Sequence, residues 1–375
     1  MDKIDVAIIG GGVVGLAVAA SIAEKDKDIF IFEKHFSFGQ ETSSRNSEVI
    51  HSGIYYPKDS FKRKTCVEGN ELLYDICRQG KIPHRKIGKM IIARDNSDLE
   101  GLEKLFRQGM ENGLQGLKML DKKEIAELEP NIRACRAIYL PMTGIIDSHS
   151  LMEYFLLKAK SNGADIVYDS EIKSIEKVPD GYKVTIMSNT NEEMAFLSRI
   201  VINCAGLEAD VISEMIGIKN KDYKLSYCKG DYFRVGNRKN LMVKRLIYPV
   251  ANADDTFLGI HVTPDLTGGV RLGPDAEYVN NRNMDYAINP DKSNLFYADT
   301  KTFLPFLEKD DLSVDTSGIR PKLQKKGEGF RDFVIKHEAS LGFEGFVNLI
   351  GIESPGLTAS PAIAKTVKNI ISKLI

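Results

Sequence analysis

The feature that most constrains this chain is a glycine-rich turn near its start. Residues 4–9 form an apolar, β-rich run, Gly10-Gly11-Gly12-Val13-Val14-Gly15 follows, and residues 13–25 have a helical pattern. In a strand–turn–helix unit, Gly10 permits the tight turn, Gly12 lets the backbone approach a pyrophosphate, and Gly15 lets helix and strand pack closely. The helix N-terminus, with Val13 and Val14, offers N–H groups to phosphates. The pattern therefore predicts a dinucleotide site.

A second apolar strand, residues 29–32, ends at Glu33 and Lys34. An acidic side chain at that distance accepts hydrogen bonds from a ribose 2′-OH and disfavours a 2′-phosphate. This fingerprint alone does not separate NAD from FAD. The rest of the chain argues against an NAD dehydrogenase, because a long polar loop (39–56) replaces regular βα units. Small-residue elements also recur at 201–206 and 351–358.

Hydrophobic periodicity and turn residues predict the other elements. We expect helices over 60–79, 97–112, 148–162, 291–306 and 357–374, and a hairpin over 169–187 that turns at Pro179-Asp180-Gly181. We expect further strands over 199–204, 226–235, 245–250, 257–263, 269–272, 333–337 and 346–349.

Composition excludes several classes of protein. Lys and Arg (51) nearly balance Asp and Glu (52) over 375 residues, which argues against a nucleic-acid binder. The five cysteines are widely spaced without C-x-x-C, and the six histidines show no metal-binding spacing, so neither a disulfide framework nor a metal site is predicted. With no signal-like segment and no helix candidate long enough to span a bilayer, we expect a cytoplasmic protein. We expect any membrane contact to be peripheral, at the inner membrane.

Further motifs are spread over nearly the whole chain: Arg45–Tyr56, Cys66–Asn70, Gly88–Ala93, Thr143–Asp147, Lys229–Tyr232, Ile247–Val250, Leu258–Pro264, Leu272–Pro274 and Gly318–Pro321. At these motifs the chain resembles the FAD-dependent D-amino-acid-oxidase-like superfamily, within which it is most similar to L-2-hydroxyglutarate dehydrogenases and oxidases. The segment Arg320-Pro321 and the C-terminal motif Glu353–Pro361 depart from those enzymes; Arg320-Pro321 looks more like related amine and glycerol-3-phosphate flavoenzymes.

The resemblance implies an α/β fold (α+β overall), in which a Rossmann-like FAD-binding domain is interleaved with a substrate domain built on a mixed or antiparallel β-sheet. The expected FAD-binding domain comprises residues 1–80, 147–215 and 335–375. The expected substrate domain comprises residues 81–146 and 216–334.

The resemblance also implies that the chain oxidises a small anionic 2-hydroxy acid, foremost L-2-hydroxyglutarate to 2-oxoglutarate, by hydride transfer to flavin N5. Electrons would pass on to a quinone, a carrier or O2. The alternatives are an amine or amino-acid oxidase and a glycerol-3-phosphate dehydrogenase of the same superfamily. A flavin-binding protein without turnover is a third alternative, because fold does not imply function.

Oxidation of a hydroxy acid needs a base for the hydroxyl proton and a clamp for the carboxylate. Arg320 is the expected clamp and His261, placed in a short strand, the expected base. His51 is the rival base, although a histidine in a similar loop carries the flavin covalently in some relatives; we expect non-covalent FAD. Each has a structural alternative, such as an ordinary core or surface role. Further candidates are Tyr55 and Tyr56 at the pocket and Lys229 at a distal carboxylate.

The remaining candidates hold the cofactor. Ser43, Ser44, Arg45 and Asn46 are expected along the pyrophosphate and ribityl chain, unless they form an ordinary polar loop. The last helix is expected to begin at Gly356-Leu357-Thr358, where its dipole would stabilise negative charge at N1 and C2=O of the reduced flavin. The predicted cofactor residues also include Lys34, Ser47, His51, Ala205, Gly206, Arg320, Ser354 and Pro355.

Overall fold

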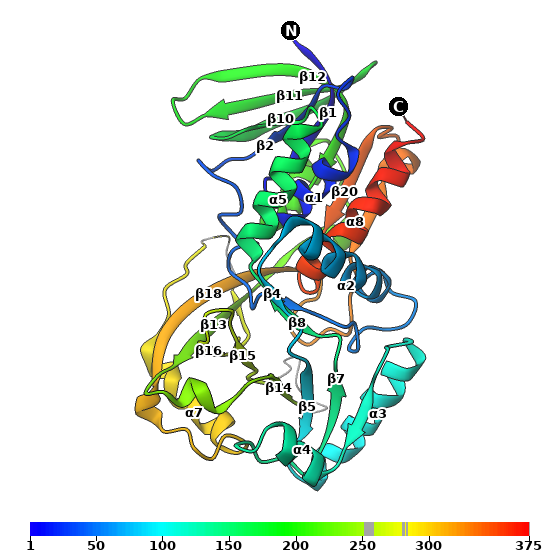
Figure 1. Ribbon diagram of the computed structural model, residues 1–375. Coiled ribbons are helices and arrows are strands. Elements are labelled where there is room, and N and C mark those ends of the chain that lie inside the picture. Colours follow the sequence, from blue (N-terminus) through cyan, green and yellow to red (C-terminus); the bar gives the residue numbers. More distant parts are fainter. Residues whose placement is uncertain (251–258, 280–281, 283, 375) are drawn as a thin grey trace.

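A parallel sheet forms the centre of the upper half of the molecule (Figure 1). The computed structural model describes residues 1–250, 259–279, 282 and 284–374. Parallel pairing joins β9, β2, β1, β12 and β20 in that order, β19 adds antiparallel to β20, and the β10–β11 hairpin continues from β12. The strands are β1 (Lys3–Ile9), β2 (Ile29–Phe32), β9 (Asp165–Val167), β10 (Ser170–Val178), β11 (Gly181–Ser188), β12 (Glu193–Asn203), β19 (Val334–His337) and β20 (Phe346–Ile350).

Both faces of this sheet are buried, as expected for parallel strands. In β1, Val6 and Ile8 face one hydrophobic core while Ala7 and Ile9 face another. On the first face, α1 packs between α5 and α8, and α8 packs against α2. The second face is covered in part by α6. The helices are α1 (Val13–Ile22), α2 (Phe61–Gly80), α5 (Ser148–Ser161), α6 (Ala209–Met215) and α8 (Gly356–Ile371).

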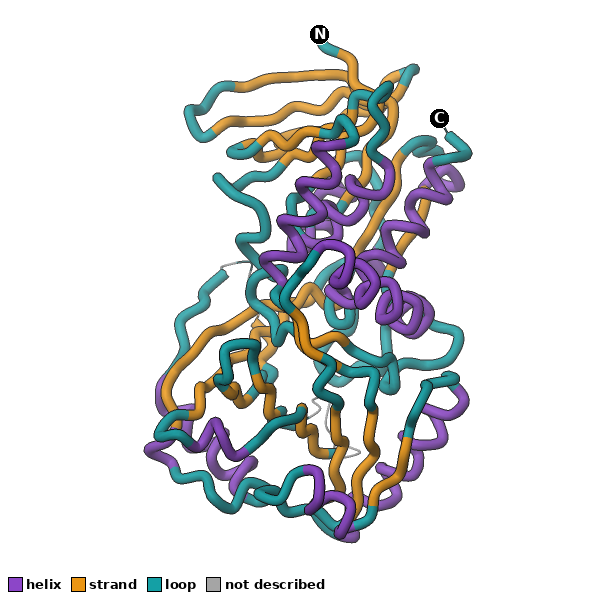
Figure 2. The backbone as a smooth tube through the Cα atoms, viewed as in Figure 1, coloured by secondary structure: helices purple, strands orange, loops and turns teal. Residues whose placement is uncertain are grey.

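A larger sheet forms the lower half, with α3, α4 and α7 at its outer edges (Figures 1 and 2). Its order is β17-β13-β16-β15-β14-β5-β7-β6, and β18 pairs with β13. The strands are β5 (Lys89–Ala93), β6 (Lys118–Leu120), β7 (Arg136–Leu140), β13 (Ser226–Val235), β14 (Leu246–Pro249), β15 (Val262–Pro264), β16 (Val270–Leu272), β17 (Glu277–Val279) and β18 (Leu312–Lys322). The helices are α3 (Leu99–Glu111), α4 (Lys122–Leu128) and α7 (Ser293–Lys301).

A three-stranded sheet lies between the two halves, in the order β3-β8-β4. Its strands are β3 (Val49–Ile50), β8 (Gly144–Ile146) and β4 (His84–Arg85). The chain passes repeatedly between the halves: the upper sheet uses strands from 3–32, 165–203 and 334–350, and the lower sheet uses strands from 89–140 and 226–322.

The predicted mixed α/β architecture with a Rossmann-like sheet is confirmed, but several boundaries were wrong. His261 lies just before β15 rather than in a strand, because Gly259 has a φ of +75° that interrupts extended backbone; Phe257 and Leu258 lie outside the described residues. Helix α7 ends at Lys301 rather than at 306, because Pro305 disfavours helical geometry in the residue before it. Helix α1 ends at Ile22, and β12 begins at Glu193 rather than at 199.

The described residues offer neither a membrane-spanning helix nor a metal-binding cluster. No helix there is long and apolar enough to cross a membrane. In the same part of the chain, no group of three or more His, Cys, Asp or Glu side chains is arranged to hold a metal ion.

The contact between α2 and α8 yields a stability prediction. A Cβ at Gly69 would lie 2.9 Å from the Ala359 Cα and closer still to the Thr358 carbonyl oxygen, both on rigid backbone of α8. Gly69→Ala is expected to lower the free energy of unfolding by about 1–3 kcal/mol, because α2 and α8 must move apart to make room for the added methyl group. Gly329→Ala is the control, since a Cβ there meets nothing within 4 Å. Thermal unfolding of the two variants measures the difference, and equal melting temperatures would contradict the packing described.

Candidate active site

One large cavity lies where the carboxyl ends of the upper parallel strands meet β18 and the start of α8. Its volume is about 530 Å³, within the range typical of cofactor and ligand sites. The lining comes from segments far apart in the sequence, between residues 9 and 62, 170 and 282, and 318 and 357. Parallel strands bring these segments together because all their carboxyl ends reach the same edge of the sheet.

The nucleotide end of the cavity is built around Glu33. Its Oε2 accepts a hydrogen bond from the Gly11 N–H at 2.7 Å, and its Oε1 accepts one from the His35 N–H at 2.9 Å. The carboxylate thereby ties the glycine turn to the end of β2. Glu33 is buried in the protein yet lines the cavity, where a ribose hydroxyl can reach it.

The start of α1 is free of acidic side chains and has no side-chain cap at Gly12. The Val13 N–H instead donates to Ser43 Oγ at 3.0 Å, and a Cβ on Gly12 would lie 2.9 Å from that oxygen. The loop around Ser43 therefore lies across the helix N-terminus. Asn46 holds this loop by donating to the Ser43 carbonyl at 2.7 Å.

An adenine dinucleotide requires three features that are present here. They are a helix N-terminus with a positive dipole end, a glycine turn that lets the pyrophosphate approach the backbone, and a buried hydrogen-bond acceptor at the end of β2. The residues present therefore fit FAD. At the other end of the cavity, α8 begins at Gly356 with no side-chain cap on Pro355 and no acidic residue in its first turn. Such a helix end stabilises negative charge placed against it.

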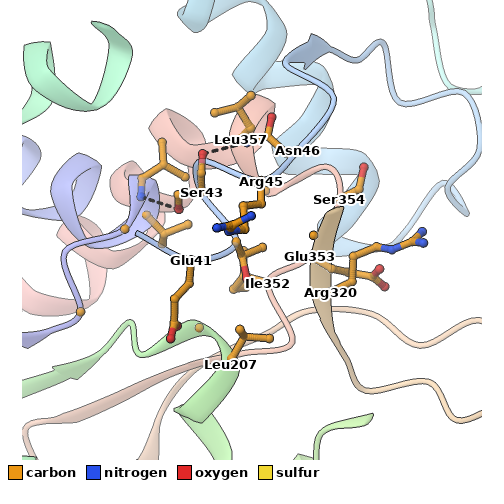
Figure 3. A pocket seen from close by; sticks show the side chains of 18 of the residues that line it. Glu41, Ser43, Arg45, Asn46, Leu207, Arg320, Ile352, Glu353, Ser354 and Leu357 are labelled. Atoms are coloured by element: carbon orange, nitrogen blue, oxygen red, sulfur yellow. Dashed lines mark hydrogen bonds between the residues drawn. The ribbon is translucent and has the colours of Figure 1, made fainter. Parts of the chain in front are cut away.

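Most of the predicted site residues line this cavity. They are Gly10, Gly12, Val13, Val14, Glu33, Lys34, Ser43, Arg45, Asn46, Ser47, His51, Tyr55, Tyr56, Ala205, Gly206, His261, Arg320, Ser354, Pro355, Gly356 and Leu357. Figure 3 shows Glu41, Ser43 and Arg45 on one side of the cavity and Arg320, Glu353 and Ser354 on the other.

Four predicted residues do not line the cavity. Gly15 packs helix α1 against the Gly10 carbonyl, and Ser44 Oγ donates to the Glu41 carbonyl. Thr358 is fully buried; its Oγ1 accepts from the His51 N–H at 3.0 Å and donates to the Val49 carbonyl at 3.1 Å.

Lys229 is the fourth residue away from the cavity. Side chains alternate along a strand, and in β13 it is Gly230 and Tyr232 that face the cavity. Lys229 points to the other side, where its ammonium donates to the Ala287 carbonyl and lies 3.8 Å from Asp231. The expected contact between Lys229 and a distal carboxylate is therefore not supported by its position.

The two candidate bases line the same cavity in different settings. His51 is held through its backbone by Thr358 and by Asn70, whose amide donates to the His51 carbonyl at 2.8 Å. Its Nε2 lies 3.5 Å from Ser354 Oγ. Burial, and then the charge of Lys89, hold the pKa of His51 well below its usual value, so the ring is neutral at pH 7. The His261 ring lies flat on the Tyr248 ring, with centroids 3.4 Å apart.

Lys89 was missed by the sequence analysis, although a lysine inside the apolar strand 89–93 was a usable signal. Its side chain is 1% exposed and makes no hydrogen bond or ion pair with a described residue. Its ammonium lies 3.8 Å from the Tyr248 ring centroid and 5.7 Å from that of Tyr55. Burial lowers the pKa of Lys89 to about 7, against a smaller opposing effect of Cys66.

The sequence matches the family described as FAD dependent oxidoreductase over residues 5–370. The chain belongs to this family. It is an FAD-dependent oxidoreductase, and its cofactor is FAD. The family match covers nearly the whole chain, so the upper and lower halves of the molecule both belong to it.

The alignments with similar proteins extend over almost the whole chain. The mitochondrial L-2-hydroxyglutarate dehydrogenase of Arabidopsis thaliana is 36% identical over 98% of this chain and 83% of its own length. The glycerol 3-phosphate dehydrogenase of Caloramator mitchellensis is 29% identical over 99% of this chain and 74% of its own. Among solved structures, the FAD-bound L-alpha-glycerophosphate oxidase of Mycoplasma pneumoniae superposes with a TM-score of 0.86 at 28% identity, over 99% of this chain and 94% of its own.

The burial of Lys89 yields a pH-dependent prediction. Between pH 7 and about 10.4 the unfolded chain binds a proton at Lys89 that the native protein does not, so this group lowers stability progressively as pH falls through that range. Lys89→Met is therefore expected to raise the free energy of unfolding by about 2–3 kcal/mol near pH 8. The gain should shrink toward pH 10 and stay constant below pH 7.

Urea unfolding of the FAD-loaded enzyme across this pH range measures the gain. The control is Lys118→Met, which changes an exposed lysine of the same sheet. A stability gain that does not depend on pH, or a loss at every pH, would contradict the described burial of Lys89.

Proposed function

We propose that this enzyme oxidises L-2-hydroxyglutarate to 2-oxoglutarate. The observation that carries the proposal is Arg320 in the wall of the cavity. Its Nη2 donates to the Asp275 carbonyl at 2.8 Å, and no described carboxylate forms an ion pair with it. A half-buried guanidinium without a carboxylate partner among the described residues is suited to bind a substrate carboxylate through two parallel hydrogen bonds. The name of the 36% identical relative supports the same substrate.

FAD, when bound, supplies the hydride acceptor at flavin N5. The chain must orient the substrate and remove its hydroxyl proton. Arg320 fixes the carboxylate so that the reacting C–H faces the cofactor, which saves the entropy of finding that orientation. The walls formed by Tyr55, Tyr56 and Tyr248 exclude water from the reacting carbon.

His51 is the proposed base. A base must be neutral before it accepts a proton, and burial and Lys89 favour the neutral ring. The proton moves from the substrate hydroxyl to a ring nitrogen of His51, whose position Thr358 and Asn70 hold through the backbone. His261, stacked on Tyr248, is assigned to the wall of the pocket rather than to proton transfer.

Glycerol 3-phosphate is the second candidate substrate. It is favoured by the Caloramator mitchellensis relative and by the Mycoplasma pneumoniae structure, whose names specify it. Arg320 can also bind a phosphate. As part of the same proposal, the reduced flavin passes its electrons to a quinone, a carrier or O2. We also propose that the enzyme works in the cytoplasm, where its five free thiols stay reduced.

The test is an anaerobic substrate panel. The FAD-loaded enzyme is mixed with L-2-hydroxyglutarate, D-2-hydroxyglutarate, glycerol 3-phosphate or an amino acid, and the loss of flavin absorbance is followed. We expect L-2-hydroxyglutarate alone to reduce the flavin on the time scale of catalytic turnover. Reduction by glycerol 3-phosphate or by amines alone would overturn it.

Variants of the two histidines separate their roles. His51→Gln is expected to slow flavin reduction by roughly 10²–10⁴-fold, because general-base catalysis contributes that much. His261→Gln keeps the pocket polar and is expected to change substrate affinity more than the reduction rate. Rapid-mixing measurement of the reduction rate at saturating substrate distinguishes them, and a larger loss of rate in His261→Gln would assign the base to His261 instead.

A further inference from the structure

Strand β18 presents a row of side chains to the cavity. Gly318, Arg320 and Lys322 occupy alternate positions and all line it, and Gln324 continues the row just beyond the strand. The residues between them, Ile319 and Leu323, belong to the hydrophobic core behind the strand. Strand alternation thus places a second cation, Lys322, beside the proposed carboxylate clamp.

Lys322 shares a buried carboxylate with a third cation, Lys62 of α2. Lys322 Nζ lies 2.9 Å from both oxygens of Glu353, and Lys62 Nζ lies 2.9 Å from Oε1. The side chains of Lys62, Lys322 and Glu353 are 7%, 13% and 7% exposed. Burial alone would raise the pKa of Glu353, but the two ammonium groups outweigh it and hold that pKa at about 2. The carboxylate is therefore ionised at every physiological pH.

This corner of the cavity carries more positive than negative charge. Arg320, Lys322 and Lys62 are three cations, and Glu353 is the one carboxylate paired with them among the described residues. Asp275, which lies nearby, directs its carboxylate to Lys292 at 2.9 Å and does not line the cavity. Glu353 offsets one of these three positive charges, so the corner keeps a net positive charge of about two in a largely buried place, where uncompensated charge is costly. A ligand with two negative charges would balance this charge.

We propose that Lys322, with Lys62 beside it, binds the distal carboxylate of a dicarboxylic 2-hydroxy acid while Arg320 binds the carboxylate next to the reacting carbon. This rests on the proposed function and narrows its substrate class to short dicarboxylates. Side chains two residues apart on a strand are separated by about 6.6 Å, a span that a five-carbon diacid can bridge. A lysine acts as a point charge and suits the distal group, whereas the arginine fork suits the group that must be oriented.

Binding of inert acids to the FAD-loaded enzyme tests the assignment without turnover. Glutarate carries two carboxylates and butyrate one, and each is titrated against the flavin spectrum. Lys322→Gln is expected to weaken glutarate binding by roughly tenfold or more while changing butyrate binding by less than about twofold. Lys322→Arg, which keeps the charge, should retain most of the glutarate affinity. Lys365→Gln, an exposed lysine of α8, is the control.

The outcomes separate this inference from the proposed function. Lys322→Gln leaves Glu353 paired with Lys62, and Lys62→Gln leaves it paired with Lys322, so a folding failure of one variant leaves the other informative. If the variant binds glutarate and butyrate with equally reduced affinity, the inference is overturned. If neither affinity falls, the inference is also overturned, whichever substrate the enzyme oxidises. Weakening of glycerol 3-phosphate but not of glutarate overturns the dicarboxylate assignment and favours a phosphate at this site.

Discussion

The active site depends on the parallel pairing of β1 and β20 with the two sides of β12. Ile9 is in register with Asn203, and Asn203 is in register with Asn348, so segments more than 300 residues apart end at one sheet edge. The Asn203 amide donates to the Asn348 side chain at 2.8 Å inside the protein. Without this register, the glycine turn, the loop around Ser43 and the start of α8 would not face one cavity.

Charge in this protein is arranged locally rather than globally. The net charge of the chain is -1, so no overall field attracts an anionic substrate. At the nucleotide end, Lys34 is balanced by Glu41 and Glu208. At the substrate end, Glu353 balances only part of the charge of Lys62, Lys322 and Arg320. The difference between the two ends supports the proposed anionic substrate, although the chain as a whole is nearly neutral.

Local patterns predicted the elements that depend on local chemistry. The glycine turn, Glu33 and the strand 29–32 were predicted because their spacing alone defines the nucleotide end, and Arg320 because of its motif. The sequence could not show that Lys62 and Lys322 meet one carboxylate, since Lys62 lies in α2, Lys322 in β18 and Glu353 in the segment before α8. Alternation along β18 was a signal for Lys322, and alternation along β13 argued against Lys229. The break before His261 depended on the conformation of a single glycine.

The most direct test is a crystal structure of the FAD-loaded enzyme with 2-oxoglutarate bound. We predict that the adenosine ribose lies against Glu33, the first carboxylate on Arg320 and the distal carboxylate on Lys322. We also predict that the oxygen at the reacting carbon lies within hydrogen-bond distance of His51. A distal carboxylate directed away from Lys322 and Lys62, or a nucleotide placed away from Glu33, would contradict the account.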